Sequence, residues 1–127
     1  MDDFRSVLVL YARDVAATRQ CYETIGLALR EEKHGDGPVH YAGELPGGCI
    51  LEIYPMRAGA DAKPCQSAML ILYTADFDAV VAGLKAMELK PRDPEVYLRE
   101  DGLRATSVRD PDGFLIRLLE RPAPTVH

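Results

Sequence analysis

The sequence lacks the features that mark several common classes of protein. It has no basic run longer than two residues, and its formal net charge is -5, so a nucleic-acid-binding surface is not expected. No apolar stretch approaches the roughly 18 residues that a membrane-spanning helix needs. The N-terminal MDDFRS is acidic, and the start of the chain lacks a signal-peptide core. We therefore expect a cytoplasmic protein that binds neither nucleic acid nor membranes.

Cysteine is also scarce. The three cysteines, Cys21, Cys49 and Cys65, cannot all pair within one chain, and no C-x-x-C occurs. Reduced thiols in a cytosolic protein are the simplest interpretation. No histidine lies at a recognisable sequence distance from any of them, so we expect structural or incidental thiols and not nucleophiles. The glycines of HGDGPVH (34–40) indicate a hairpin turn and not a phosphate-binding loop.

What the sequence does contain is one internal repeat. VLVLYARD (7–14) aligns with MLILYTAD (69–76), and four of the eight positions are identical. Each segment is typical of a buried strand that ends at an Asp helix cap. A helical stripe with spacing 3, 4, 3 follows each strand, formed by Val15, Thr18, Tyr22 and Ile25 in the first half and by Phe77, Val80, Leu84 and Met87 in the second.

The two halves agree again at their ends, where GGCILEIYP (47–55) aligns with DGFLIRLLE (112–120). Each half has room for two more strands, near 28–33 and 39–43 in the first half and near 95–99 and 104–109 in the second. The pattern predicts an α+β fold of two tandem β-α-β-β-β modules. We expect a single domain over 1–127, with module one at about 4–56, a link at 57–66 and module two at about 67–121.

Two such modules in 127 residues resemble the vicinal oxygen chelate superfamily, which includes glyoxalase I, extradiol dioxygenases, fosfomycin-resistance enzymes and bleomycin-resistance proteins. The resemblance spans residues 4–121 and rests on VLYARDVAATRQCYETIGL and DPDGFLIRLLE. It implies a mixed sheet curled into a cup with the helices outside. It also implies a homodimer, in which each cup is completed by both chains or by exchanged modules.

Metal-dependent members of that superfamily hold a divalent ion in the cup through ligands on the first and last strands of each module. By register, these four positions here are Val7, Glu52, Met69 and Arg117. Val7 has no ligating atom, Met69 offers only a weak thioether, and Arg117 is a permanent cation. A catalytic metal site needs about three protein ligands. We therefore expect no metal cofactor at these positions.

Strand alternation places Glu52 and Arg117 on the cup face of equivalent strands. Three arrangements remain open for them. They can pair, within or between chains, and so replace the ion as the charged centre of the cup. Alternatively, Arg117 can bind an anionic ligand, or each charge can reach solvent at the rim.

The same alternation places Tyr11, Tyr54 and Tyr73 on the cup face among aliphatic side chains. Such a lining suits a flat or aromatic ligand, unless the side chains fill the cup themselves. His40 is considered as a base or substitute ligand, although a structural role is more common for a strand histidine. A metal pair of His40 and Glu52 would lack a third ligand, and His34 and His127 are expected to be inert.

The leading hypothesis is a metal-free small-molecule binding protein of the glyoxalase/bleomycin-resistance type that sequesters an aromatic or amphipathic ligand. It assigns no catalytic residue and places the ligand against Val7, Tyr11, Glu52, Tyr54, Met69, Tyr73 and Arg117. The alternative is a glyoxalase I-like lyase (lactoylglutathione lyase) or another divalent-metal-dependent enzyme, with Glu52 as the base. A third possibility is a metal-free enzyme that uses Glu52 or His40 as a general base. The charge of the ligand stays open.

Overall fold

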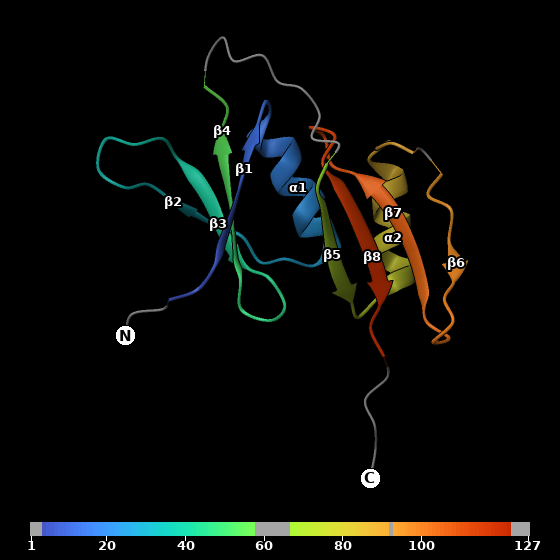
Figure 1. The fold of residues 1–127 in the computed structure, drawn as a ribbon. Helices are drawn as coiled ribbons and strands as arrows, with labels where there is room; N and C mark the ends of the chain where they lie inside the picture. Colours follow the sequence, from blue (N-terminus) through green and yellow to red (C-terminus); the bar gives the residue numbers. More distant parts are fainter. Residues whose placement is uncertain (1–3, 58–66, 92, 123–127) are drawn as a thin grey trace.

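The structure, a computed structural model, describes residues 4–57, 67–91 and 93–122. Figure 1 shows two sheets and two helices that follow one another in the order β-α-β-β-β, twice. The predicted fold class is confirmed. The first module consists of β1 (Val7–Ala12), α1 (Val15–Ile25), β2 (Arg30–Glu32), β3 (His40–Glu44) and β4 (Ile50–Pro55). The second consists of β5 (Met69–Thr74), α2 (Phe77–Ala86), β6 (Tyr97–Leu98), β7 (Arg104–Arg109) and β8 (Leu115–Glu120).

Residues 58–66, which form nearly all of the predicted link and include Cys65, lie outside the described residues, as does His127.

The two sheets have equivalent topologies. Their strand orders are β1-β4-β3-β2 and β5-β8-β7-β6, and the first and last strands of each module lie side by side in parallel. The remaining neighbours are antiparallel. The duplication seen in the sequence is therefore a duplication of structure, and a position in one sheet has a mate in the other.

Both helices begin at the aspartates that the sequence predicts as caps. Oδ1 of Asp14 accepts a hydrogen bond of 3.1 Å from the backbone N–H of Ala17, and Asp76 accepts one of 3.3 Å from Ala79. Each carboxylate thus satisfies a first-turn N–H group that has no partner within the helix. Helix α1 ends at Gly26, whose φ of 120° is readily adopted only by a residue without Cβ.

One hydrophobic core serves both modules. Each sheet turns one face toward the helices, with Leu51 and Ile53 in the first sheet and Ile116 and Leu118 in the second all at 0% exposure. Helix α1 lies between the two sheets, and α2 covers the second sheet (Figure 1). The two helices contact each other, and their buried residues join a single cluster. Within residues 4–57, 67–91 and 93–122, no helix covers the opposite face of either sheet.

Among the described residues, no helix has the length and apolar character needed to cross a membrane.

Candidate functional site

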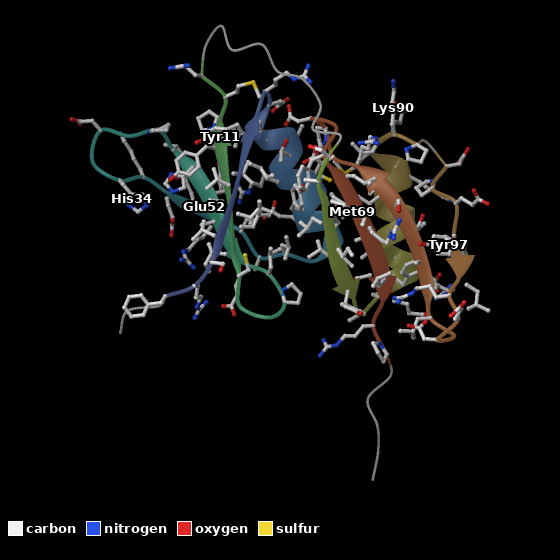
Figure 2. The ribbon with its side chains drawn as sticks, viewed as in Figure 1. Tyr11, His34, Glu52, Met69, Lys90 and Tyr97 are labelled. Atoms are coloured by element: carbon white, nitrogen blue, oxygen red, sulfur yellow. The ribbon has the colours of Figure 1, made fainter. Side chains whose placement is uncertain are left out.

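The uncovered face of the first sheet is formed by alternate residues of β1 and β4, and we call it the first open face: Val7, Val9, Tyr11, Ile50, Glu52 and Tyr54. In the parallel register, Val9 lies opposite Glu52 and Tyr11 lies opposite Tyr54. The two tyrosine rings have centroids 6.2 Å apart. Tyr11 is 60% exposed, which is high for an aromatic residue in a sheet. Figure 2 shows Tyr11 and Glu52 at the first sheet.

The equivalent residues of β5 and β8 form the second open face: Met69, Ile71, Tyr73, Leu115 and Arg117. Ile71 lies opposite Arg117 in the parallel register. Ile71 and Tyr73 are each 48% exposed, and Met69 is 39% exposed. All seven residues that the sequence assigns to the ligand site therefore lie on an open face, three of them on the second sheet and four on the first.

Glu52 and Arg117 do not meet within one chain. The Glu52 carboxylate instead lies near His40, with 3.4 Å between Oε2 and Nε2. Nε of Arg117 is buried and has no hydrogen-bond partner among the described residues. Glu52 lies on β4 of the first sheet and Arg117 on β8 of the second, and each sheet contains strands of one module only. Pairing between chains and binding of an anion both remain predictions.

Tyr54 is a polar aromatic group that interacts with both His40 and Glu52. Its ring stacks on the His40 ring, with centroids 4.1 Å apart and planes 8° from parallel. Desolvation, followed by the negative charge of Glu52, raises the pKa of the Tyr54 hydroxyl above its usual value. A hydrogen bond with the Glu52 carboxylate contributes to the raised pKa, so the hydroxyl stays protonated at neutral pH and is directed at Glu52.

A group of titratable side chains beside the first open face was not found from the sequence. Glu32, His34 and His40 each direct a ligating atom to one place, and these atoms all lie within 4.8 Å of one another. Glu32 and His40 are directly opposite in the β2–β3 pairing. The signal was present in EKHGDGPVH, since a hairpin through HGDGP pairs the strand residues before and after it. The sequence analysis expects His34 to be inert, and the structure places its ring 5.0 Å from that of His40.

Most of the chain matches one known protein family. Residues 6–118 match the Glyoxalase/Bleomycin resistance protein/Dioxygenase superfamily. The chain belongs to this superfamily. A search of curated proteins gave no significant match.

Several solved structures share the fold over almost their full length. A glyoxalase/bleomycin resistance protein from Albidiferax ferrireducens T118 has a TM-score of 0.68 and 21% identity, covering 94% of this chain and 100% of that one. "Oxidase ChaP-H2" has a TM-score of 0.66 and 21% identity, covering 98% of each chain. TioX from Micromonospora sp. ML1 has a TM-score of 0.63 and 19% identity, covering 94% and 100%. At such identities these likenesses establish the fold and not the activity.

Proposed function

We propose that the protein binds an aromatic or amphipathic small molecule between the first open face of one chain and the second open face of another. The observation that carries this proposal is the exposure of apolar side chains on both faces, with Tyr11 at 60% and Ile71 and Tyr73 at 48%. Contiguous apolar surface of this kind, bordered by charges, is typical of interaction and ligand-binding sites.

A homodimer supplies the missing half of each cup. The two open faces of one chain lie on separate sheets, and apolar residues on both remain exposed, so neither face encloses a ligand alone. If the first open face of one chain meets the second open face of its partner, a two-fold axis creates the same contact a second time. Two equal cavities then form, each with three tyrosines and aliphatic walls that suit a flat ligand.

In this arrangement Arg117 has two possible anionic partners. One is Glu52 of the partner subunit, which stands at the mated position of the other sheet. The other is an anionic group of the ligand itself. The unpartnered, buried Nε of Arg117 supports both, because a buried guanidinium nitrogen without an acceptor is costly. Ligand binding here uses no metal at the four family positions, since Val7, Met69 and Arg117 are unsuitable ligands.

The test uses two aromatic probes of opposite charge, anilinonaphthalene sulfonate and proflavine, in the presence of a chelator. We expect at least one probe to bind and to raise the melting temperature in a concentration-dependent manner. Arg117→Met should weaken the binding of the anionic probe. The matched control is Arg99→Met, since Arg99 pairs with Asp101 in the turn between β6 and β7, and β6 is the edge strand farthest from β5 in the second sheet. Equal loss in both variants, or no binding of either probe, would overturn the proposal.

The enzyme alternatives are tested in the same samples. Addition of Ni²⁺, Zn²⁺ or Mn²⁺ with the hemithioacetal of methylglyoxal and glutathione measures lactoylglutathione lyase activity. Turnover that appears with metal and disappears with chelator would replace the binding proposal by a lyase. The carboxylate of Glu52 is the available base, so the same activity should then fail in Glu52→Gln. Recovery of chemically unchanged probe and no turnover supports a binding protein.

A further inference from the structure

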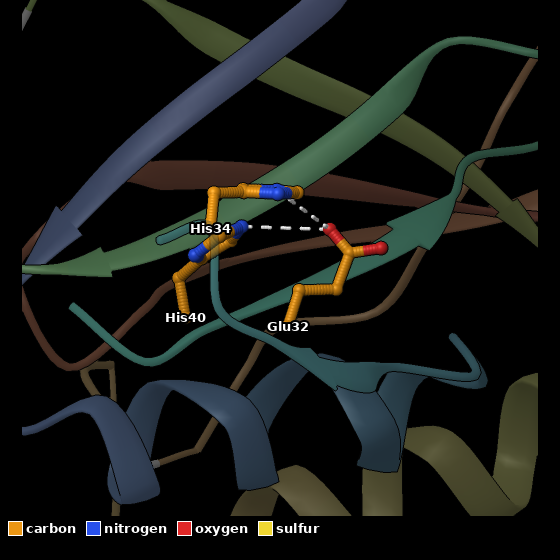
Figure 3. Close-up of side chains that lie close together, drawn as sticks. All are labelled: Glu32, His34 and His40. Carbon is orange, nitrogen blue, oxygen red and sulfur yellow. Dashed lines mark ion pairs between the residues drawn. The ribbon is translucent and has the colours of Figure 1, made fainter. Parts of the chain in front are cut away.

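The cluster beside the first open face is built on the hairpin between β2 and β3. Oε1 of Glu32 lies 3.4 Å from Nε2 of His40 and 3.7 Å from Nε2 of His34. Figure 3 shows the two imidazole rings directed at the same carboxylate oxygen. The rings are themselves close, with centroids 5.0 Å apart. Two imidazole nitrogens and one carboxylate oxygen thus converge on one point.

One ring nitrogen of His40, Nε2, lacks the hydrogen-bond partner that a buried imidazole nitrogen normally has. It is only 1% exposed. Its Nδ1 lies 3.2 Å from the carbonyl oxygen of Pro38, which can only accept, so Nδ1 carries the proton. Nε2 makes no hydrogen bond, although it lies 3.4 Å from carboxylate oxygens of both Glu32 and Glu52. A neutral imidazole in this tautomer turns its lone pair toward two carboxylates, an arrangement that either a metal ion or a proton on Nε2 would relieve.

Hydrogen bonds with neighbouring residues orient His40 and Glu32 in the way that metal ligands are usually oriented. The Pro38 carbonyl fixes the His40 tautomer that leaves Nε2 free to ligate. Nε of Arg30 donates a hydrogen bond of 2.9 Å to Oε2 of Glu32, which leaves Oε1 for the two histidines. The hydrogen bond from Arg30 lowers the pKa of Glu32, and desolvation offsets this effect only in part. The carboxylate therefore stays ionised, as a ligand for a cation must be.

We propose that Glu32, His34 and His40 bind one divalent transition-metal ion, for which Zn²⁺ is the best fit. Two ligands of a tetrahedral Zn²⁺ at about 2.0–2.1 Å are separated by about 3.4 Å, close to the 3.4 Å and 3.7 Å between the Glu32 oxygen and the two imidazole nitrogens. Imidazole ligands favour Zn²⁺, Ni²⁺ and Cu²⁺, whereas Mg²⁺ and Ca²⁺ favour sites made of oxygen atoms. The His34 side chain is 72% exposed, which gives the ion a route from solvent. Glu52 or water completes the coordination.

None of the three proposed ligands is among the four family positions, although Glu52, which is one of those positions, lies beside them. The expectation of no metal rested on Val7, Met69 and Arg117, and none of these takes part in the cluster. The ion would be held by a hairpin of the second and third strands and would lie next to Glu52, at the border of the first open face. Because the ligand test above is done with chelator, a failure of the metal site and a failure of the ligand site give different results.

The test is a calorimetric titration of the full chain, stripped of metal by chelator, with Zn²⁺. We expect one ion per chain, and we expect Co²⁺ to give the visible absorption bands of a low-coordinate site with nitrogen ligands. His34→Ala changes an exposed turn residue and Glu32→Gln keeps the shape of the side chain, so both variants should fold. Each should weaken Zn²⁺ binding by more than about tenfold, because even the loss of a residue that only orients a ligand costs about 10–100-fold in metal affinity.

Two control variants leave the three proposed metal ligands unchanged. Glu31→Gln changes the neighbouring carboxylate, which accepts a hydrogen bond from Tyr41 and not from the cluster. His127→Ala removes the terminal histidine of the sequence. Both should bind Zn²⁺ like the unmodified chain. The proposal is overturned if less than one ion binds per two chains, or if His34→Ala and Glu32→Gln retain full affinity. A site that holds only an extra proton on His40 would give this negative result.

Discussion

The hydroxyl of Tyr22 donates a hydrogen bond of 2.9 Å to Oδ2 of Asp110, joining helix α1 of the first module to the β7–β8 turn of the second. Both side chains are buried, at 0% and 5% exposure. The other oxygen of Asp110 accepts the backbone N–H groups of Asp112 and Phe114, each at 2.9 Å. One carboxylate therefore shapes the DPDG turn and attaches it to the other module.

Removing the Tyr22 hydroxyl should weaken the whole fold. In Tyr22→Phe, a buried carboxylate loses one of its hydrogen bonds, and we expect the free energy of unfolding to fall by about 1–3 kcal/mol. Urea unfolding measures this change. The matched control is Tyr41→Phe, whose hydroxyl makes an exposed bond of 3.3 Å to Glu31 and should matter little. A loss in Tyr22→Phe no larger than in Tyr41→Phe would contradict the account of the joint between the modules.

Asp110 should also make stability depend on pH in an unusual direction. Burial raises the pKa of Asp110 above its ordinary value of 3.8, and its hydrogen bonds offset only part of this. Between pH 3.8 and the raised pKa, the folded state binds more protons than the unfolded state, so this contribution to stability falls as the pH rises.

The comparison that isolates this effect is with Asp110→Asn, which cannot titrate. The free energy of unfolding of the unmodified chain minus that of Asp110→Asn should decrease as the pH rises through the raised pKa and then become constant. Urea unfolding of both proteins at a series of pH values gives the difference. A difference that grows with pH would mean that the hydrogen bonds outweigh burial at this carboxylate.

The described cysteines should differ sharply in reactivity. Burial, together with the nearby charge of Asp110, raises the pKa of the Cys21 thiol to about 12, and the side chain is 0% exposed. The thiolate is the reactive form, so Cys21 should resist alkylation, whereas the half-buried Cys49 should react at least about tenfold faster. Mass spectrometry of a Cys65→Ser variant during iodoacetamide treatment follows each site. Equal labelling rates in the folded protein would contradict this, and denatured protein should label both equally.

Much of the fold could be predicted from the sequence because its signals are local. The alternation in VLVLYARD and MLILYTAD and the following Asp caps determine a strand and a helix start within a few residues. The strand predicted at 104–109 is observed as β7 with the same bounds, and the one predicted near 95–99 is reduced to Tyr97–Leu98 in β6. The seven open-face residues follow from the same alternation.

How the two modules pack against each other could not be predicted from such local signals. A repeat shows that Glu52 and Arg117 are mates, but not whether their sheets face each other. That depends on contacts such as Tyr22 with Asp110, which lie 88 residues apart. The histidine cluster was missed for a related reason, since Glu32 and His40 come together only when the hairpin register is known.

The central claim, that a second chain covers each open face, is tested most directly by the molar mass in solution, measured by light scattering with size-exclusion chromatography. The account predicts twice the mass of one chain for the unmodified protein. It predicts the mass of one chain for Ile71→Asp, which places a charge in the middle of the second open face. The control Leu98→Asp changes a residue that is 71% exposed on β6 and should remain a dimer. A single-chain mass for the unmodified protein, or an unchanged dimer in Ile71→Asp, would contradict the account.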